Sequence, residues 1–428
     1  MLRADCEAGM GDALLSVEEA LQRVLAAVHT LEDEEVDTLA ALGRVLAEDI
    51  VADFDVPPFP NSAMDGYAVR AADTAGAAAD HPVELRVIAD IPAGDAQGIA
   101  VTAGSASRIM TGAPLPPGAD AVVPVEWTDE PWTRDDRPLP ERVRVFRAVS
   151  PQAHVRPAGE DIQRGETVLR RGSKLRPQEI GVLAALGRPR VRVVRRPRVA
   201  ILATGDELVD IAAPLGPGQI HDSNSYTLAA LVENSGGVPI RLGIARDRLE
   251  EVRARLRAGL EQGADLFLSS AGVSVGAYDV VKAALEAEGE LAFWRVNMRP
   301  GKPLAFARVR DVPFLGLPGN PVSAAVAFEV FARPAILKMG GRTALARPRV
   351  EAILDEPVRS DGRESYLRAV VTRRNDGYHA VITGPQSSGI LTSLVRANAL
   401  LVVPAGVRQV PAGNKLQAVM LDWPEEVF

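Results

Sequence analysis

The chain has 428 residues, 47% of them hydrophobic, and a formal net charge of −8, which is the composition of an ordinary globular protein of three or four domains. It has no apolar stretch long enough to span a bilayer and no secretory pattern at its N-terminus, and Cys6 is its one cysteine. Membrane spans, disulfide frameworks and cysteine metal sites are therefore excluded. The acidic charge gives no argument for nucleic acid, and the five scattered histidines give none for zinc. We expect a cytoplasmic protein.

The N-terminal half predicts two helical segments that flank β-structure. Residues 15–30 have helical spacing, with Ser16 and Glu19 forming a capping box, and a second helix is expected over 36–47. A proline-rich stretch then leads into short β-type runs up to about residue 150, a pattern typical of a small β-rich domain. Helix and turn signals return over 156–190, and the basic segment 188–198 is best explained as a solvated edge strand.

The C-terminal half changes character. Apolar runs that begin at Val199, Ile240, Leu266 and Leu291 alternate with helical patterns at about 224–235, 248–262, 278–287 and 321–339. This alternation predicts a doubly wound α/β domain with a mostly parallel sheet. Residues 345–428 have short β runs and no long helix, which predicts a small β-barrel or sandwich.

Three loops follow predicted strands of the α/β domain, at 204–208, 269–279 and 317–323. Ligands bind beyond the carboxyl ends of strands in such sheets. Each loop alone is explained by turn-forming glycine, but three at one sheet edge favour a functional site. The carboxylates of Glu207 and Asp279 could hold a Mg²⁺ ion against a phosphate. The chain has no dinucleotide fingerprint and no Walker A lysine, which disfavours NAD and P-loop interpretations.

The third loop joins a strand at 312–317 to a helix. Asn320 is a good N-cap residue and Pro321 suits the first helical position. The start of a helix attracts anions, and Arg299 and Lys302 add positive charge from the preceding turn. The segment predicts a pocket for a tetrahedral oxyanion.

Two turn-rich stretches lie in the β-rich region, at 61–68 and 108–120. Both have a plain structural interpretation, and Asp65 with Gly66 would by itself form a type I′ turn. Nothing in their physics joins them to the site in the α/β domain.

Seven motifs together resemble the molybdopterin molybdenumtransferase family, whose module also forms the C-terminal part of animal gephyrin. The motifs occur in the family's order and span nearly the whole chain, at 61–68, 110–113, 159–162, 204–208, 272–276, 300–303 and 317–323.

The resemblance implies four domains. They are an extended helical linker domain (12–52 plus 156–196), a β-rich inserted domain (53–155), an α/β molybdopterin- and nucleotide-binding domain (197–342) and a C-terminal β-barrel (343–428). The family works as a homodimer, with its cleft between the α/β and C-terminal domains of one subunit and the β-rich domain of the other. Such sharing explains why Asp65 and Thr111 look detached within one chain.

The implied activity is that of a molybdopterin molybdotransferase. It inserts molybdate into adenylylated molybdopterin, releases AMP and uses Mg²⁺. A molybdopterin adenylyltransferase and molybdoenzyme apoproteins are implied partners. Three alternatives stay open: a paralogue that inserts tungstate, a molybdopterin adenylyltransferase, and a non-catalytic scaffold like gephyrin.

The resemblance also assigns site residues. The catalytic group is Asp65, Thr111, Glu207 and Asp279. The implied Mg²⁺ ligands are Glu207, Asp279 and Asp65, with Asp161 and Asp247 as weaker candidates. The molybdate ligands are Arg299, Lys302, Ser323, Ser388 and Arg363 or Arg368. The nucleotide and pterin contacts are Thr204, Gly205, Ser223, Asn224, Gly272, Ser274, Gly276, Pro318, Gly319 and Asn320. Asp222 or Ser223 would otherwise be a simple N-cap.

The chain departs from the family pattern at two places. Arg299 stands where the family usually has lysine, which keeps the charge but replaces a compact ammonium with a planar fork. Ala277 stands where the family often has an aspartate, so one acidic group is lost near Asp279.

Overall fold

The computed structural model describes residues 14–94, 98–130, 138–270, 278–288 and 291–423. These residues form two compact units: those of unit 1 fall within Met1–Glu35, Gly43–Ala47 and Arg192–Phe428, and those of unit 2 within Val36–Leu42 and Glu48–Val191. The finer four-domain boundaries stay a prediction. No helix of the described segments combines the length and apolar character that a membrane crossing requires.

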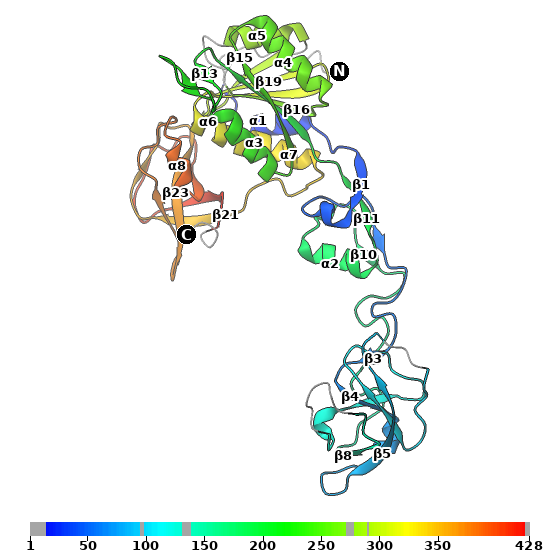
Figure 1. Ribbon diagram of the computed structural model, residues 1–428. Coiled ribbons are helices and arrows are strands. Elements are labelled where there is room, and N and C mark those ends of the chain that lie inside the picture. The colour runs from blue at the N-terminus through cyan, green and yellow to red at the C-terminus, as the bar shows by residue number, and fades with distance from the viewer. Residues whose placement is uncertain (1–13, 95–97, 131–137, 271–277, 289–290, 424–428) are drawn as a thin grey trace. The chain divides into compact units, whose positions relative to one another are not determined.

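Unit 1 contains the expected α/β sheet (Figure 1). Its strand order is β15-β12-β16-β20-β19-β17. The first four strands are parallel to one another, while β19 and β17 are antiparallel to their neighbours. The bounds are β12 Arg198–Thr204, β15 Val238–Ala245, β16 Leu266–Ser270, β17 Leu291–Arg295, β19 Pro303–Val309 and β20 Val312–Leu317. The mostly parallel sheet predicted from the alternating pattern is confirmed.

Helices cover both faces of this sheet (Figure 1). Side chains of β12 alternate between two cores, with Val199 and Ile201 facing one and Ala200 and Leu202 facing the other. The helices on the first face are α1 Val17–Ala26, α3 Asn224–Asn234, α6 Pro321–Ala327 and α7 Arg333–Met339, with the π-helical turn η4 Phe328–Ala332 between the last two. Those on the second face are α4 Leu249–Glu261 and α5 Tyr278–Glu288. The doubly wound prediction is therefore correct.

The C-terminal part of unit 1 is a closed β-barrel. Strands β23, β24, β21, β27 and β25 follow one another, and β25 pairs back onto β23. The short strand β18 Met298–Arg299 pairs in parallel with the start of β23, which ties the barrel to the turn before β19. The bounds are β21 Arg349–Leu354, β22 Val358–Arg359, β23 Glu364–Arg374, β24 Gly377–Ile382, α8 Thr392–Val395, β25 Ala399–Val403, β26 Gln409–Val410 and β27 Lys415–Met420. Of the two predicted alternatives, the barrel is confirmed.

Unit 2 is built around a five-stranded sheet of order β7-β4-β6-β5-β8. Its strands are β4 Gly66–Val69, β5 Val83–Ile91, β6 Ser105–Ile109, β7 Ala121–Pro124 and β8 Arg142–Val145. Smaller elements complete the described fold: β1 Asp33–Asp37, η1 Thr38–Ala41, β2 Ile50–Val51, β3 Asn61–Ser62, η2 Ala71–Thr74, η3 Val125–Trp127, β9 Val155–Arg156, β10 Thr167–Leu169, α2 Pro177–Ala185, β11 Arg190–Val194, β13 Leu208–Val209 and β14 Ile220–His221.

The helix expected over 36–47 is wrong. The structure has the end of a strand and one 3₁₀ turn there. The backbone N–H of Thr38 donates to Pro189 O, and that of Ala47 donates to Arg192 O, so these donors serve distant segments. Gly43 also takes a left-handed φ of 78°, which ends any helical run.

The type I′ turn that Asp65 and Gly66 would form by themselves is not present. Gly66 begins strand β4 and pairs with Pro124 of β7. A Cβ atom added at Gly66 would lie 2.0 Å from the carbonyl oxygen of Val123. Close approach of two strands, and not turn geometry, therefore explains this glycine.

The basic segment 188–198 does form an edge strand. In β11 the residues alternate between exposed and buried, as a half-buried strand requires. Its arginines pair with carboxylates: Arg190 with Asp37, and Arg195 with Asp265 at 2.7 Å. The positive charge is consequently balanced locally.

Candidate functional site

The three predicted site loops of unit 1 follow neighbouring strands, because β12, β16 and β20 are adjacent in the sheet. Two hydroxyls at this edge are buried without a hydrogen-bond partner among the described residues, those of Thr204 and Ser270. Buried polar groups are normally satisfied. Unsatisfied hydroxyls at the carboxyl ends of parallel strands therefore indicate where a polar ligand would bind.

A group of carboxylates lies at the same edge. Asp206 and Glu207 follow β12, and Asp247 follows the adjacent strand β15. Burial, together with repulsion from Asp206 and Glu207, raises the pKa of Asp247. One oxygen of Asp247 is buried without a partner among the described residues. The Glu207 carboxylate folds over Gly205, where an added Cβ would lie 2.5 Å from Oε2. Among the described residues, the groups that act on the pKa of Asp247 are the carboxylates of Asp206 and Glu207 and no cation.

Four residues expected at this edge cannot be placed. Gly272, Ser274 and Gly276 lie outside the described residues, and so does the side chain of Asp279, whose backbone belongs to α5. Among the described residues, no three acidic, histidine or cysteine side chains are grouped closely enough to hold a metal ion by themselves.

The loop before α3 connects to the loop after β20. Asn224 donates from its side-chain amide to Gly319 O at 2.7 Å, which holds the two loops together. Asp222 is buried and accepts from Ser225 N at 3.0 Å, so its role is that of a helix cap. The Ser223 side chain makes no capping bond.

The start of α6 has the predicted local structure. Asn320 is the N-cap residue and Pro321 is the first helical residue. Pro318 is buried, whereas Gly319 and Asn320 are exposed. One backbone N–H of the first helical turn is already hydrogen-bonded, because Val322 N donates to Ser388 O at 3.1 Å. The barrel loop around Ser388 therefore lies against the start of α6, where Ser323 is buried.

Arg368 is the largest fully buried side chain among those described, with 1% exposure. Its guanidinium donates to Ser393 Oγ at 3.1 Å and to Ser387 O at 3.0 Å. No carboxylate pairs with it among the described residues. Burial, with a smaller effect of nearby Arg299, lowers its pKa to about 10. A buried cation without a counter-ion favours binding of an anion.

The other predicted cations differ in how they are engaged. The guanidinium of Arg363 donates from two nitrogens to the Asp361 carboxylate and from its third nitrogen to Met298 O at 3.1 Å. The guanidinium of Arg363 lowers the pKa of the Asp361 carboxyl. Arg299 lies 3.7 Å from the same carboxylate and is half-exposed. Lys302 is exposed and has no ion pair within the described residues.

Unit 2 holds the remaining predicted catalytic pair. Asp65 Oδ1 accepts from both Thr111 N (2.7 Å) and Thr111 Oγ1 (2.8 Å). Gly112 N donates to Ser62 O at 2.8 Å, so the two turn-rich stretches that the sequence could not join lie together. Asp161 is exposed, and no described contact connects it to this pair.

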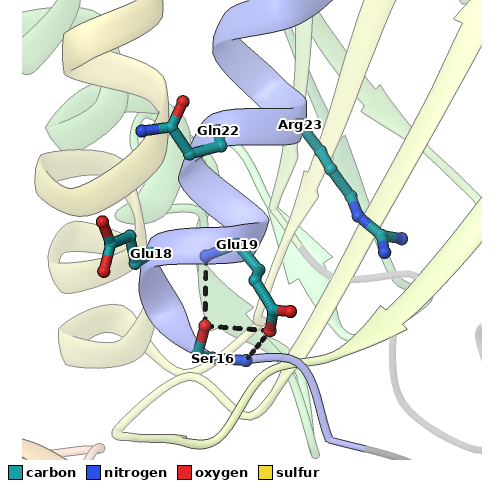
Figure 2. A pocket seen from close by; sticks show the side chains of 5 residues that line it. All are labelled: Ser16, Glu18, Glu19, Gln22 and Arg23. Atoms are coloured by element: carbon teal, nitrogen blue, oxygen red, sulfur yellow. Dashed lines mark hydrogen bonds between the residues drawn. The ribbon is translucent and has the colours of Figure 1, made fainter.

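A surface hollow on α1 contains none of the predicted site residues. Ser16, Glu18, Glu19, Gln22 and Arg23 line it. Figure 2 shows that Ser16 and Glu19 bond to each other across the first turn. This is the predicted capping box, and we assign it a structural role.

Two arrangements of the candidate site depend on the tertiary structure, those of Asp247 and of Ser393. Asp247 follows an edge strand whose neighbour carries Asp206 and Glu207, a juxtaposition that only the strand order reveals. Ser393 contacts Arg368 across 25 residues of sequence, and no sequence signal predicts that contact.

Three family models match the chain. "MoeA N-terminal region (domain I and II)" matches residues 15–187, "Probable molybdopterin binding domain" matches 200–338 and "MoeA C-terminal region (domain IV)" matches 351–421.

Similar proteins extend over nearly the full length. A Mycobacterium tuberculosis protein named molybdopterin molybdenumtransferase 2 is 40% identical over 410 residues, which is 94% of this chain and 98% of that protein. A molybdopterin molybdenumtransferase of Nostoc is 41% identical over 398 residues, 91% of this chain and 89% of the relative. The crystal structure of a molybdopterin biosynthesis MoeA protein from Pyrococcus horikosii has a TM-score of 0.79 at 31% identity, covering 96% of this chain and all of that one. This chain belongs to the molybdopterin molybdenumtransferase family.

Proposed function

We propose that this protein inserts molybdate into adenylylated molybdopterin and releases AMP. The reaction needs a pocket for a tetrahedral dianion next to a site for a nucleotide, and it needs no protein nucleophile. The single observation that carries the proposal is the buried guanidinium of Arg368, which has no carboxylate partner among the described residues. Molybdate would supply the missing negative charge.

The molybdate pocket is proposed where the barrel meets the start of α6. Arg368 bonds to Ser387, and the next residue, Ser388, bonds to Val322 beside Ser323. These contacts support Arg368, Ser388 and Ser323 as ligands, with the exposed Arg299 and Lys302 as further cations. The donors of Arg363 are engaged with Asp361 and Met298, which argues for Arg368 over Arg363.

The nucleotide and pterin are proposed to bind along the carboxyl edge of the sheet. The unsatisfied hydroxyl of Thr204, the backbone at Gly205 and the linked loops at Asn224 and Gly319 support this location. Ser223, Pro318 and Asn320 belong to the same loops. Gly272, Ser274 and Gly276 are proposed on the resemblance alone.

Magnesium is proposed at the same edge. Mg²⁺ is usually held by one or two carboxylates and completes its shell with water and substrate phosphates. The neighbouring carboxylates of Glu207 and Asp247 fit such an open site. When bound, the ion would neutralise charge on the phosphoanhydride. The protein's own residues bind and orient the nucleotide, and Asp279 is a further candidate ligand on the resemblance.

We also propose a cytoplasmic homodimer. Asp65 and Thr111 form one polar pair in unit 2, and we infer that this pair acts on the anhydride bound to unit 1 of the partner subunit. Asp161 stays a weaker candidate. An adenylyltransferase that hands over the nucleotide substrate, and apoenzymes that accept the product, remain proposed partners.

The test is release of AMP by the purified full-length protein. It is given adenylylated molybdopterin, Mg²⁺ and molybdate, and AMP is measured by chromatography. We expect AMP release that depends on molybdate, and its absence would refute the proposal. Tungstate is run in parallel, because the two oxyanions are nearly equal in size. The full-length relatives disfavour an adenylyltransferase and a pure scaffold.

A further inference from the structure

One loop of the barrel, residues 383–393, surrounds a single residue of strand β23. Gln386 accepts from the backbone N–H of Arg368 at 2.9 Å and donates to its carbonyl at 3.2 Å. The N–H of Thr383 donates to the same carbonyl at 3.0 Å. Ser387 and Ser393 then accept from the guanidinium. The loop thereby fixes both the backbone and the side chain of Arg368.

The contact with Ser393 is directional. Its hydroxyl donates to the carbonyl of Ile390 at 2.6 Å, so the lone pairs of the oxygen face Nε of Arg368 at 3.1 Å. Ser393 is itself buried, with 2% exposure. A hydroxyl whose only proton is committed elsewhere is held as an acceptor, and it fixes the plane of the guanidinium.

Both acceptors that the described residues offer to this guanidinium are neutral. A carboxylate would hold Arg368 equally well but would cancel its charge and compete with an anionic ligand. A hydroxyl and a carbonyl take two of the five N–H donors and leave the remaining donors and the full charge to a ligand. This arrangement suits binding of a dianion better than it suits stability, because burial of an unpaired charge is costly.

We propose that Ser393 is a positioning residue for oxyanion binding, holding the guanidinium fork of Arg368 toward the molybdate pocket. The inference rests on the molybdate site proposed above. Removing the hydroxyl leaves Arg368 charged but takes away the contact at Nε that fixes the plane of its guanidinium. Molybdate binding then weakens, whereas the nucleotide side of the reaction is untouched.

The experiment uses the full-length protein and follows AMP release at varied molybdate. We expect Ser393→Ala to raise the KM for molybdate about tenfold, the loss typical of one hydrogen bond to a charged group, with kcat and the KM for adenylylated molybdopterin within about twofold of wild type. Ser393→Thr keeps the hydroxyl and should restore most of the affinity. Ser105→Ala is the matched control, since it removes another buried hydroxyl, in unit 2.

A double-mutant cycle separates positioning from a general structural role. If Ser393 acts through Arg368, Ser393→Ala should have no further effect on the molybdate KM in an Arg368→Ala background. Equal effects in both backgrounds would overturn the inference, as would an unchanged KM in the single variant. A variant that unfolds would appear as a loss of kcat and of melting temperature, and Ser393→Thr would then decide. A wild-type protein without molybdate-dependent AMP release would instead refute the proposed function.

Discussion

At the residue scale, the candidate site has two charged side chains that lack a neighbour of opposite charge among the described residues. Arg368 is a buried cation without a carboxylate, and Asp247 is a carboxylate crowded by two others. Both arrangements reduce stability in the free protein and become favourable once a ligand of opposite charge binds. Structural ion pairs elsewhere, such as Arg195 with Asp265, are satisfied within the chain.

Arg363, which directly precedes β23, and Arg368, which lies within it, make a matched pair for substitution. We predict that Arg368→Lys raises the KM for molybdate about tenfold or more, because a lysine cannot reproduce the planar fork. Arg363→Lys should leave this KM nearly unchanged and lower the melting temperature instead, because Arg363 anchors Asp361 and Met298. Steady-state AMP release and thermal denaturation measure the two effects. The reverse pattern would assign the pocket to Arg363.

Asp247 gives a prediction about pH. Its pKa in the folded protein is raised, so between the unfolded and folded pKa values the native state binds more protons and stability falls as pH rises. At neutral pH the ionised group is therefore destabilising. Asp247→Asn should raise the melting temperature by about 1–2 °C at pH 7.5, and the gain should shrink toward pH 4, while activity falls.

Calorimetry of the ligand-free protein across this pH range measures the effect. A lower melting temperature for Asp247→Asn at pH 7.5 would mean that the carboxylate is stabilised by a cation or donor in the free protein. Asp210→Asn, a substitution of an exposed aspartate on the neighbouring segment, serves as the control and should show little change.

At the element scale, the site depends on ends of strands. Parallel strands β12, β15, β16 and β20 deliver loops to one edge because their carboxyl ends coincide. In unit 2, by contrast, Asp65 directly precedes β4, and β4 passes very close to β7 at Gly66. The position of Asp65 therefore depends on the absence of a side chain at Gly66.

Two Gly→Ala substitutions in unit 2 should have opposite signs. Gly66→Ala would bring a methyl group to 2.0 Å from Val123 O, and we expect a loss of about 2–3 kcal/mol of unfolding free energy. Gly181 lies within α2 and a Cβ there meets nothing within 4 Å. Gly181→Ala should gain about 0.5–1 kcal/mol. Denaturant unfolding measures both, and a neutral Gly66→Ala would refute the close approach.

At the scale of the whole molecule, the proposed functional residues are divided between the two compact units. Unit 1 carries the proposed oxyanion pocket and the proposed nucleotide site, whereas unit 2 carries Asp65 and Thr111. Each unit has its own core, so each can be altered without disrupting the other. This separation permits a test of the proposed sharing of the active site between subunits.

Two inactive variants should complement each other if the active site spans two subunits. One carries Asp65→Asn in unit 2 and the other carries Lys302→Ala in unit 1. Random pairing in a C₂ dimer gives half heterodimers, each with one intact site, so co-expression should restore about a quarter of wild-type activity. Heterodimers isolated through two different tags should have about half of wild-type activity, because one of their two sites is intact. If each site lies within one chain, mixed dimers stay inactive.

Much of the fold could be predicted from the sequence. The α/β alternation, the capping box at Ser16 and Glu19, and the cap at Asn320 all came from local patterns, because hydrophobic period and capping chemistry act over a few residues. The helix expected over 36–47 failed because distant segments, at Pro189 and Arg192, accept its backbone donors.

The sequence by itself determined the family, the order of the motifs and the kinds of charged group available. Only the tertiary structure decided which of them meet: that Asp65 bonds to Thr111, that Asp247 lies beside Glu207, and that Ser393 holds Arg368. Local patterns encode periodicity and caps, but burial of a charge and its choice of partner depend on strand order and loop closure over tens of residues, which no short stretch of sequence specifies.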